Sequence, residues 1–159
     1  MRRLMRALGS LGILACSSDS TAPESISGNW TFSDATSSAQ LSGSCHATGT
    51  IRITQTGSSF TGTVVSGSNR CTVGTQSSTG SIAGSAIGHG RILAPAVSFT
   101  DNTLTEADLE TLVTKRGGGC KYTGTISGSP VNQMTGDETC IVALSDTYFL
   151  FSGTWQLNK

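Results

Sequence analysis

The sequence predicts an all-β fold, an antiparallel up-and-down meander of about eight to nine strands that closes into a small barrel with two disulfides. Serine, threonine and glycine supply 67 of the 159 residues, and charged residues supply only 13%, which favours strands over helices. A short motif recurs, as in "TGTI" at 48, "TGTV" at 61, "TGTI" at 123 and "SGTW" at 152, and indicates successive strands of one kind. We expect closure into a barrel because it removes exposed edges.

Residues 1–15 are typical of a signal peptide. Arg2, Arg3 and Arg6 precede the apolar run "ALGSLGILA", which is too short to span a bilayer as a permanent helix. The stretch "ILAC" at 13 to 16 resembles the lipobox of bacterial lipoproteins. This resemblance implies cleavage before Cys16, a lipid on that cysteine and a place in the cell envelope, and Ser17 as the next residue implies the outer membrane. The alternative is an ordinary secretory signal.

The mature chain is predicted to consist of a tether and one domain. Residues 16–25, "CSSDSTAPES", predict the lipidated cysteine and a flexible polar tether, and residues 26–159 predict a single barrel domain. Loss of the three leader arginines leaves a net charge of about −3, without the basic patch that nucleic-acid binding needs. The second face of the predicted strands is polar rather than apolar, so we expect the lipid to be the only contact with the membrane.

The first half of the domain alternates in apolar character, with a change of phase. Cys45, Ile51 and Ile53 share one parity and Phe60 and Val64 another, on either side of a "TGSS" turn. Pairing Cys45 with Cys71 then needs a change of parity after Val64, which "SGSN" at 66 to 69 supplies as a bulge or a break. Strands are expected at 26–33, 45–55, 59–66, 70–74, 79–85 and 90–100.

One segment interrupts the strands. In "DNTLTEADLETLV", residues 101–113, Leu109, Leu112 and Val113 have helical spacing, which predicts one short helix of roughly two turns. A loop is the alternative.

The segment 120–140 predicts a hairpin folded about Pro130, with strands at 120–127 and 132–143. We expect an antiparallel register in which the residue numbers of each cross-strand pair add to 260. This register places the apolar side chains on one face and threonines, Lys121 and Asp137 on the other. The predicted pairs are Cys120 with Cys140, Tyr122 with Glu138, Gly124 with Gly136, and Ile126 with Met134.

The last strand, expected at 147–157, continues this register. A two-residue turn at Ser145 and Asp146 gives paired numbers that add to 291 and keeps the apolar parity. The predicted pairs are Val142 with Phe149, Cys140 with Phe151, Glu138 with Gly153, and Gly136 with Trp155.

Four cysteines remain once Cys16 is set aside, and an even number in an exported chain predicts two disulfides. Four cysteines allow three pairings. The hairpin register favours Cys120 with Cys140, and Cys45 with Cys71 then forms a second local bridge.

The two ends of the domain resemble small barrels of the lipocalin and avidin-like group. "GNW" at 28 to 30 and "GTW" at 153 to 155 are the motifs that carry this resemblance, and Gly28 and Trp30 match the Gly-x-Trp of lipocalins. The resemblance implies that Trp30 closes one barrel end. A later lipocalin signature and the residues of the avidin biotin site are missing from the sequence.

Four residues are candidates for ligand binding. Glu138 and Tyr122 share an otherwise apolar face, where a carboxylate needs a partner, water or a ligand; a satisfied polar pair at the barrel mouth is the alternative. Trp30 and Trp155 could line a pocket, although an aromatic side chain in a small barrel more often belongs to the core.

Metal binding and catalysis find no support in the sequence. His46 and His89 have no partners at zinc-ligand spacing, and the cysteines are expected to be oxidised. Glu106, Asp108 and Glu110 match no calcium-loop pattern. The nucleophile elbow and the phosphate loop are also missing. We expect neither a metal, a cofactor nor an enzymatic activity.

These observations lead to two functional expectations. The first is an envelope lipoprotein that binds a small apolar or amphipathic molecule inside the barrel without catalysis. The second is a structural or protein-interaction module of the envelope with a packed barrel. The two differ in whether six expected inward glycines leave a cavity: Gly28, Gly49, Gly62, Gly124, Gly136 and Gly153.

Overall fold

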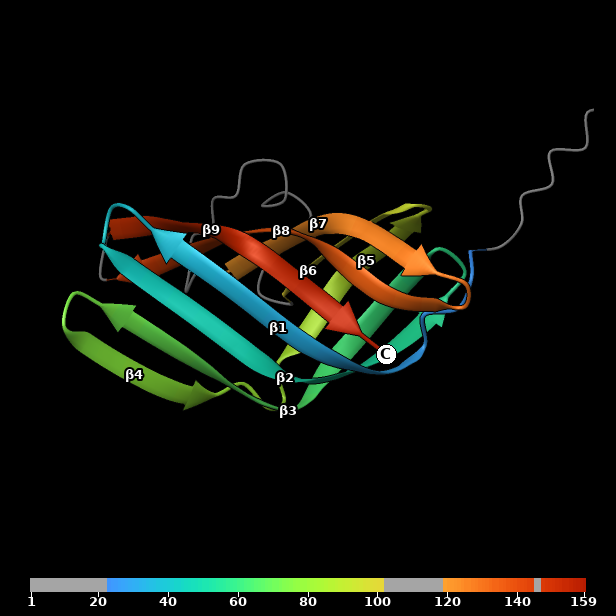
Figure 1. Ribbon diagram of the computed structural model, residues 1–159, viewed down its shortest axis with the longest axis horizontal. Coiled ribbons are helices and arrows are strands. Elements are labelled where there is room, and N and C mark those ends of the chain that lie inside the picture. Colours follow the sequence, from blue (N-terminus) through green and yellow to red (C-terminus); the bar gives the residue numbers. More distant parts are fainter. Residues whose placement is uncertain (1–22, 102–118, 145–146) are drawn as a thin grey trace, which may run out of the picture.

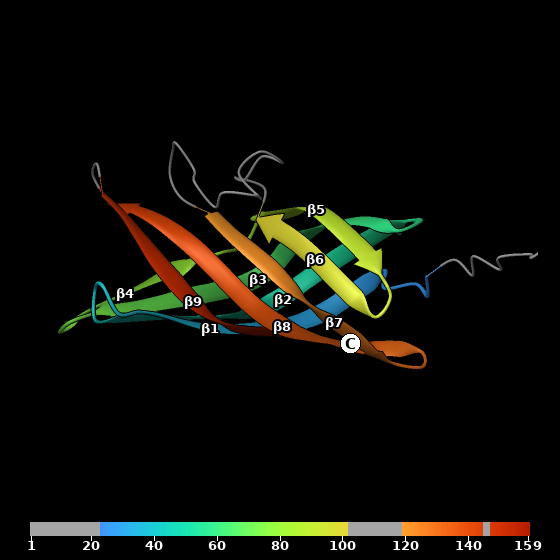
Figure 2. The same ribbon diagram turned by 90° about the horizontal axis from the view of Figure 1, so that it is seen from above.

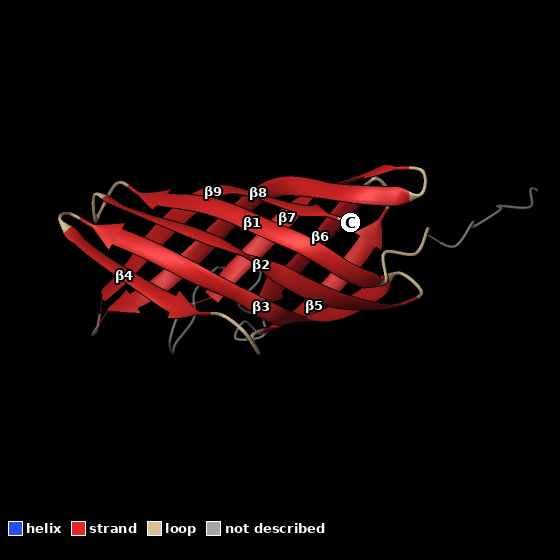
Figure 3. Cartoon of the chain, turned by 60° about the horizontal axis from the view of Figure 1, so that its bottom comes forward, coloured by secondary structure: helices blue, strands red, loops and turns tan. Residues whose placement is uncertain are grey.

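The computed structural model describes residues 23–101, 119–144 and 147–159, and all their regular structure is β-strand (Figure 1). Figure 3 shows strands and connecting loops and no helix among these residues. The strands are β1 (Gly28–Ser38), β2 (Gly43–Thr56), β3 (Ser59–Val73), β4 (Gln76–Ser81), β5 (Ala86–Leu93), β6 (Ala96–Asp101), β7 (Gly119–Gly128), β8 (Val131–Leu144) and β9 (Thr147–Asn158).

Eight of these strands form a closed antiparallel barrel. Following the ring, β1 pairs with β2, β2 with β3, β3 with β5, and β5 to β9 pair in chain order until β9 returns to β1. The ninth strand, β4, pairs with the second half of β3 and extends beside one end of the barrel (Figures 1 and 2). The predicted meander and its closure are therefore confirmed.

Three sequence predictions lie wholly or mainly outside the described residues. They are the signal peptide, most of the tether with Cys16, and the short helix at 101–113, of which only Asp101 is described, as the last residue of β6. The predicted turn at Ser145 and Asp146 also lies outside them. No helix in the described part of the chain has the length and apolar character needed to cross a bilayer.

The predicted register of the C-terminal strands is confirmed. β7 and β8 pair Tyr122 with Glu138 and Gly124 with Gly136, and β8 and β9 pair Gly136 with Trp155. The glycines let the backbones of β7 and β8 approach closely, since a Cβ at Gly136 would overlap the backbone oxygen of Thr123. The Trp155 Nε1–H donates to the carbonyl oxygens of Thr123 and Asp137.

Both predicted disulfides are present, and each joins neighbouring strands. Cys45 and Cys71 link β2 to β3, and Cys120 and Cys140 link β7 to β8. Both bridges lie at the barrel end where β1 finishes and β9 begins.

The change of parity in the first half is produced by a β-bulge. The β2–β3 register pairs Ile51 with Val64 but Thr50 with Ser66, which leaves Val65 as the extra residue. The bulge therefore comes one residue before the predicted "SGSN". Because a bulge shifts the phase without ending the ladder, the strands expected at 59–66 and 70–74 are parts of the single strand β3, which ends at Val73.

Two predicted strands need correction. Residues 90–100 do not form one strand, because Ala94 and Pro95 connect β5 to β6; proline lacks the backbone N–H that a central strand needs. The strand expected at 79–85 is β4, which begins at Gln76 and ends at Ser81.

The barrel is packed at the end where β1 begins. The side chains that fill this half are almost completely buried, and they come from the chain before β1 and from most strands of the ring: Ile26, Trp30, Ile53, Phe60, Ile92, Val97, Met134 and Leu157. Trp30 is 1% exposed and its Nε1–H donates to the carbonyl oxygen of Ile26 at 2.7 Å. Trp30 thus occupies the packed end as a core residue.

Candidate functional site

The half of the barrel that carries the disulfides encloses a cavity of about 380 Å³. All four disulfide cysteines line it, together with residues that connect β4 to β5. Most of its wall is apolar and comes from several strands and from the β4–β5 connection: Phe32, Ala47, Ile51, Val64, Ile82, Ile87, Phe99, Val142 and Phe151. The cavity thus lies between the packed half and the disulfide end.

Aromatic side chains separate the cavity from the packed half. Phe99 and Tyr122 stack with ring centroids 4.5 Å apart, and Trp155 meets the edge of this pair, 5.0 Å from Phe99. Phe32 contacts Tyr122 edge to face. These contacts hold the Tyr122 side chain in place, because the neighbouring rings favour stacked and edge-to-face geometries.

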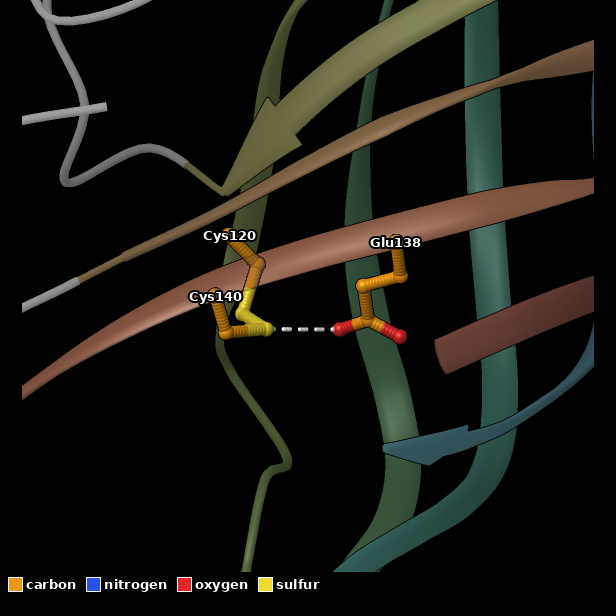
Figure 4. Close-up of side chains that lie close together, drawn as sticks. All are labelled: Cys120, Glu138 and Cys140. Atoms are coloured by element: carbon orange, nitrogen blue, oxygen red, sulfur yellow. Dashed lines mark hydrogen bonds between the residues drawn. A yellow bond between two sulfur atoms is a disulfide. The ribbon is translucent and has the colours of Figure 1, made fainter. Parts of the chain in front are cut away.

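Glu138 is the most unusual residue of the cavity wall. It lies on β8, is 3% exposed, and its Oε1 lies 2.9 Å from the Sγ of Cys140 (Figure 4). A disulfide sulfur carries no proton, so this contact is a hydrogen bond when the carboxyl group is protonated and donates. The other oxygen, Oε2, points away from the disulfide and has no hydrogen-bond partner among the described residues.

The surroundings of Glu138 favour its neutral form. Burial is the largest cause and, with the negative charge of Asp34, it raises the pKa of Glu138 from 4.5 to about 8; the Tyr122 hydroxyl offsets part of this rise. The pKa of Tyr122 is also raised well above its usual value, first by burial and then by the charges of Glu138 and Asp34. At neutral pH both groups are therefore mainly protonated in the empty cavity.

Two further carboxyl groups line the cavity. The Asp34 Oδ1 accepts from the backbone N–H of Ala47 at 2.7 Å, and burial raises the pKa of Asp34. The Asp101 Oδ2 accepts from the backbone N–H of Cys120 at 2.8 Å. The residues that line this cavity in the described part of the chain include three acids and no lysine, arginine or histidine.

The structure divides the four candidate ligand-binding residues into two pairs. Tyr122 and Glu138 lie together on the cavity wall, as their predicted register implies. Trp30 and Trp155 are 1% and 2% exposed and belong to the core cluster, and neither lines this cavity. The half-packed interior also shows that the inward glycines do not leave the whole barrel hollow.

Asp34 and Asp101 were missed by the sequence analysis, although alternation carries a signal for both. Asp34 has the parity of Trp30 and Phe32, and Asp101 has the parity of Phe99. The predicted strands ended at residues 33 and 100, just before these acids, and Asp101 was assigned to the predicted short helix at 101–113.

One set of side chains has the spacing of metal ligands. Cys120, Glu138 and Cys140 offer atoms within 4.8 Å of one another, but the two sulfurs are bonded in a disulfide and are not thiolates. His46 and His89 are exposed on the barrel surface. In its disulfide form this set does not suit a metal ion.

Comparisons with protein-family models, with curated proteins and with solved structures find no match to this chain.

Proposed function

We propose that the protein is a lipid-anchored barrel of the bacterial cell envelope that holds a small amphipathic molecule in its disulfide-end cavity. The cavity of about 380 Å³ is the observation that carries this proposal. Its size falls in the lower range of small-molecule sites, which are concave, mainly apolar and provided with a few converging polar groups.

The distribution of packing supports a binding role. A barrel that served only as a rigid module would gain stability by filling its interior, since empty apolar space forfeits van der Waals contacts. Among the described residues, one half is filled and the other holds the cavity, and the buried hydroxyl and carboxyl side chains of Thr36, Ser38, Thr100 and Glu138 lie in the cavity half. The proposal includes no catalytic step, because the sequence supplies no motif for one.

The anchor and the cellular address belong to the same proposal and rest on the leader sequence. The lipobox-like "ILAC" ending at Cys16 and the polar stretch after it support attachment through a lipid, and Ser17 supports the outer membrane. Two disulfides in the domain agree with folding in an oxidising compartment.

Filling the cavity tests the binding proposal. Ala47 is buried on the cavity wall, so Ala47→Phe places a ring in the empty space. Ala96 is exposed at the opposite barrel end, and Ala96→Phe is the matched control. We expect N-phenyl-1-naphthylamine, a neutral apolar dye, to gain fluorescence with the wild type and the control and to bind at least tenfold more weakly to Ala47→Phe.

Two results would contradict the proposal. Equal dye binding by Ala47→Phe and Ala96→Phe would place the dye elsewhere, and no binding by the wild type would favour the alternative of an envelope structural or interaction module.

A further inference from the structure

The chemistry of the cavity wall narrows the class of ligand, and this inference rests on the function proposed above. The wall carries three carboxyl groups from three strands, Asp34 of β1, Asp101 of β6 and Glu138 of β8. No basic side chain lines the same wall within the described ranges. A ligand with a carboxylate or phosphate would meet like charge in a poorly solvated space, which is unfavourable.

The Oε2 atom of Glu138 indicates which chemical group a ligand should carry. The Glu138 side chain is almost completely buried, with 3% of its surface exposed. Its Oε2 makes no hydrogen bond to any described residue. An unsatisfied buried acceptor is costly, whereas hydrogen bonds that involve an ionised group are the strong ones. A donor that carries positive charge would satisfy Oε2 and lower the repulsion between Glu138 and Asp34.

The arrangement suits an organic cation better than a metal ion. Among the described residues, the one set of potential ligands that converges is Cys120, Glu138 and Cys140, and its sulfurs are joined. Asp34 and Asp101 belong to no such set. The apolar wall around the acids and the ring of Phe99 would contact a hydrocarbon body, and the ring of Tyr122 faces the same space.

We propose that the cavity binds a small primary or secondary amine in its ammonium form, with the N–H groups donating to Glu138 and Asp34 and an apolar body packed along Phe32, Ile51 and Phe99. A neutral amphiphile would bring no positive charge to Glu138 and Asp34. A quaternary ammonium would bring the charge without the N–H that Oε2 requires.

Binding of an ammonium would release a proton. Glu138, with its pKa of about 8, is mainly neutral in the empty cavity, and an adjacent cation favours the ionised form. Among the described residues, the titratable groups that face Glu138 are Asp34 of β1, Asp101 of β6 and Tyr122 of β7, and its β9 partner is Gly153. His46 of β2 acts on Asp34 and lowers its pKa. Affinity should therefore rise with pH up to about 8 and then level off.

Three probes of equal chain length test the charge of the ligand. Octylamine, 1-octanol and octanoate are titrated into the purified protein by isothermal calorimetry at pH 8.5, where an alkylamine is still protonated. We expect octylamine to bind at least tenfold more tightly than 1-octanol, and octanoate to bind least. Below pH 8, octylamine binding should release protons, measured as a dependence of the heat on the buffer.

Two single-charge variants locate the effect. Glu138→Gln should reduce the preference for octylamine over 1-octanol at least fivefold. It should also remove most of the pH dependence of octylamine affinity, and the smaller dependence that remains at lower pH is expected from the ionisation of Asp34. Asp137→Asn removes the same charge from the neighbouring exposed position of β8 and should leave the preference unchanged.

The possible failures are distinguishable. Equal affinities for octylamine and 1-octanol, or tighter binding of octanoate, would overturn the amine proposal and leave the binding function standing. The same preference in wild type and Glu138→Gln would also overturn it. Binding of none of the three probes would overturn the binding function itself.

Discussion

At the scale of single residues, the cavity wall combines apolar side chains with two carboxyl groups, Asp34 and Glu138, whose pKa is raised by burial. Glu138 shows this most clearly, because burial and the charge of Asp34 raise its pKa from 4.5 to about 8. Its protonated Oε1 donates to the Sγ of Cys140, and Oε2 keeps its capacity as an acceptor. The residue is therefore poised to ionise when a cation enters.

The raised pKa predicts that Glu138 lowers the stability of the empty protein at neutral and alkaline pH. In the unfolded chain the group ionises near pH 4.5, and in the folded protein near 8. Stability is thus unaffected below pH 4.5, falls between pH 4.5 and 8, and stays low above 8. Since one pKa unit corresponds to about 1.4 kcal/mol, the loss amounts to several kcal/mol.

Glu138→Gln tests this prediction, because glutamine keeps the shape and never ionises. In urea unfolding of the ligand-free protein, the variant should match the wild type at pH 4 and exceed its free energy of unfolding by roughly 3 kcal/mol at pH 7. Asp137→Asn, on the exposed face, should change little at either pH. A difference between Glu138→Gln and wild type that does not grow with pH would contradict the raised pKa.

At the scale of elements, the cavity end is held by two disulfide-linked hairpins. The bridge from Cys45 to Cys71 closes the β2–β3 hairpin and that from Cys120 to Cys140 closes the β7–β8 hairpin. All four cysteines line the cavity. The bridges therefore join neighbouring strands where the inner face of the barrel borders the cavity and not the packed core.

Removal of either bridge should destabilise the protein by a similar amount. The sequence separations are 26 and 20 residues, and loops of this length correspond to about 3 kcal/mol each in the chain-entropy account. The double variants Cys45→Ser/Cys71→Ser and Cys120→Ser/Cys140→Ser should therefore each unfold at lower urea concentration. An unchanged midpoint for either variant would show that its hairpin needs no bridge.

The elements differ in how far the sequence predicts them. The register of β7, β8 and β9 follows from alternation alone, because paired cysteines and paired glycines fix one parity through both turns. The boundary between β5 and β6 was missed because apolar residues flank Pro95 on both sides. Ile92 and Val97 both point inward although their separation is odd, and this change of parity is the signal of the turn.

The candidate site is predictable in part for the same reason. Tyr122 and Glu138 lie in the best-determined register and were placed together on the inner face. The cavity depends on how many large side chains fill each half of the barrel, which is a property of packing in three dimensions. Alternation shows which side chains point inward, and it does not show whether they meet across the interior.

At the scale of the whole molecule, the described residues form a barrel with one packed end and a cavity toward the other end. Glu24 and Ile26, just before β1, lie at the packed end, where the Glu24 Oε1 accepts from the backbone N–H of Val131 in β8 and Ile26 is fully buried. The chain thus enters the barrel at the end where β1 begins (Figure 1), whereas the disulfide cysteines that line the cavity lie toward the other end.

The lipid anchor makes a separate prediction for the full chain. Expressed in a bacterial host with lipoprotein processing, the wild type should partition into the detergent phase of Triton X-114 and incorporate labelled palmitate. Cys16→Ala should remain in the aqueous phase without label, and Cys45→Ser/Cys71→Ser should keep the label as the cysteine control. Aqueous partitioning of the wild type would favour an ordinary secretory signal.

Native mass spectrometry of the purified protein with octylamine tests most directly that the open half of the barrel holds a small molecule. The account predicts one octylamine per wild-type and per Ala96→Phe protein, lost on denaturation, and no octylamine on Ala47→Phe. Equal occupancy of Ala47→Phe and wild type, or no bound octylamine on either, would contradict it.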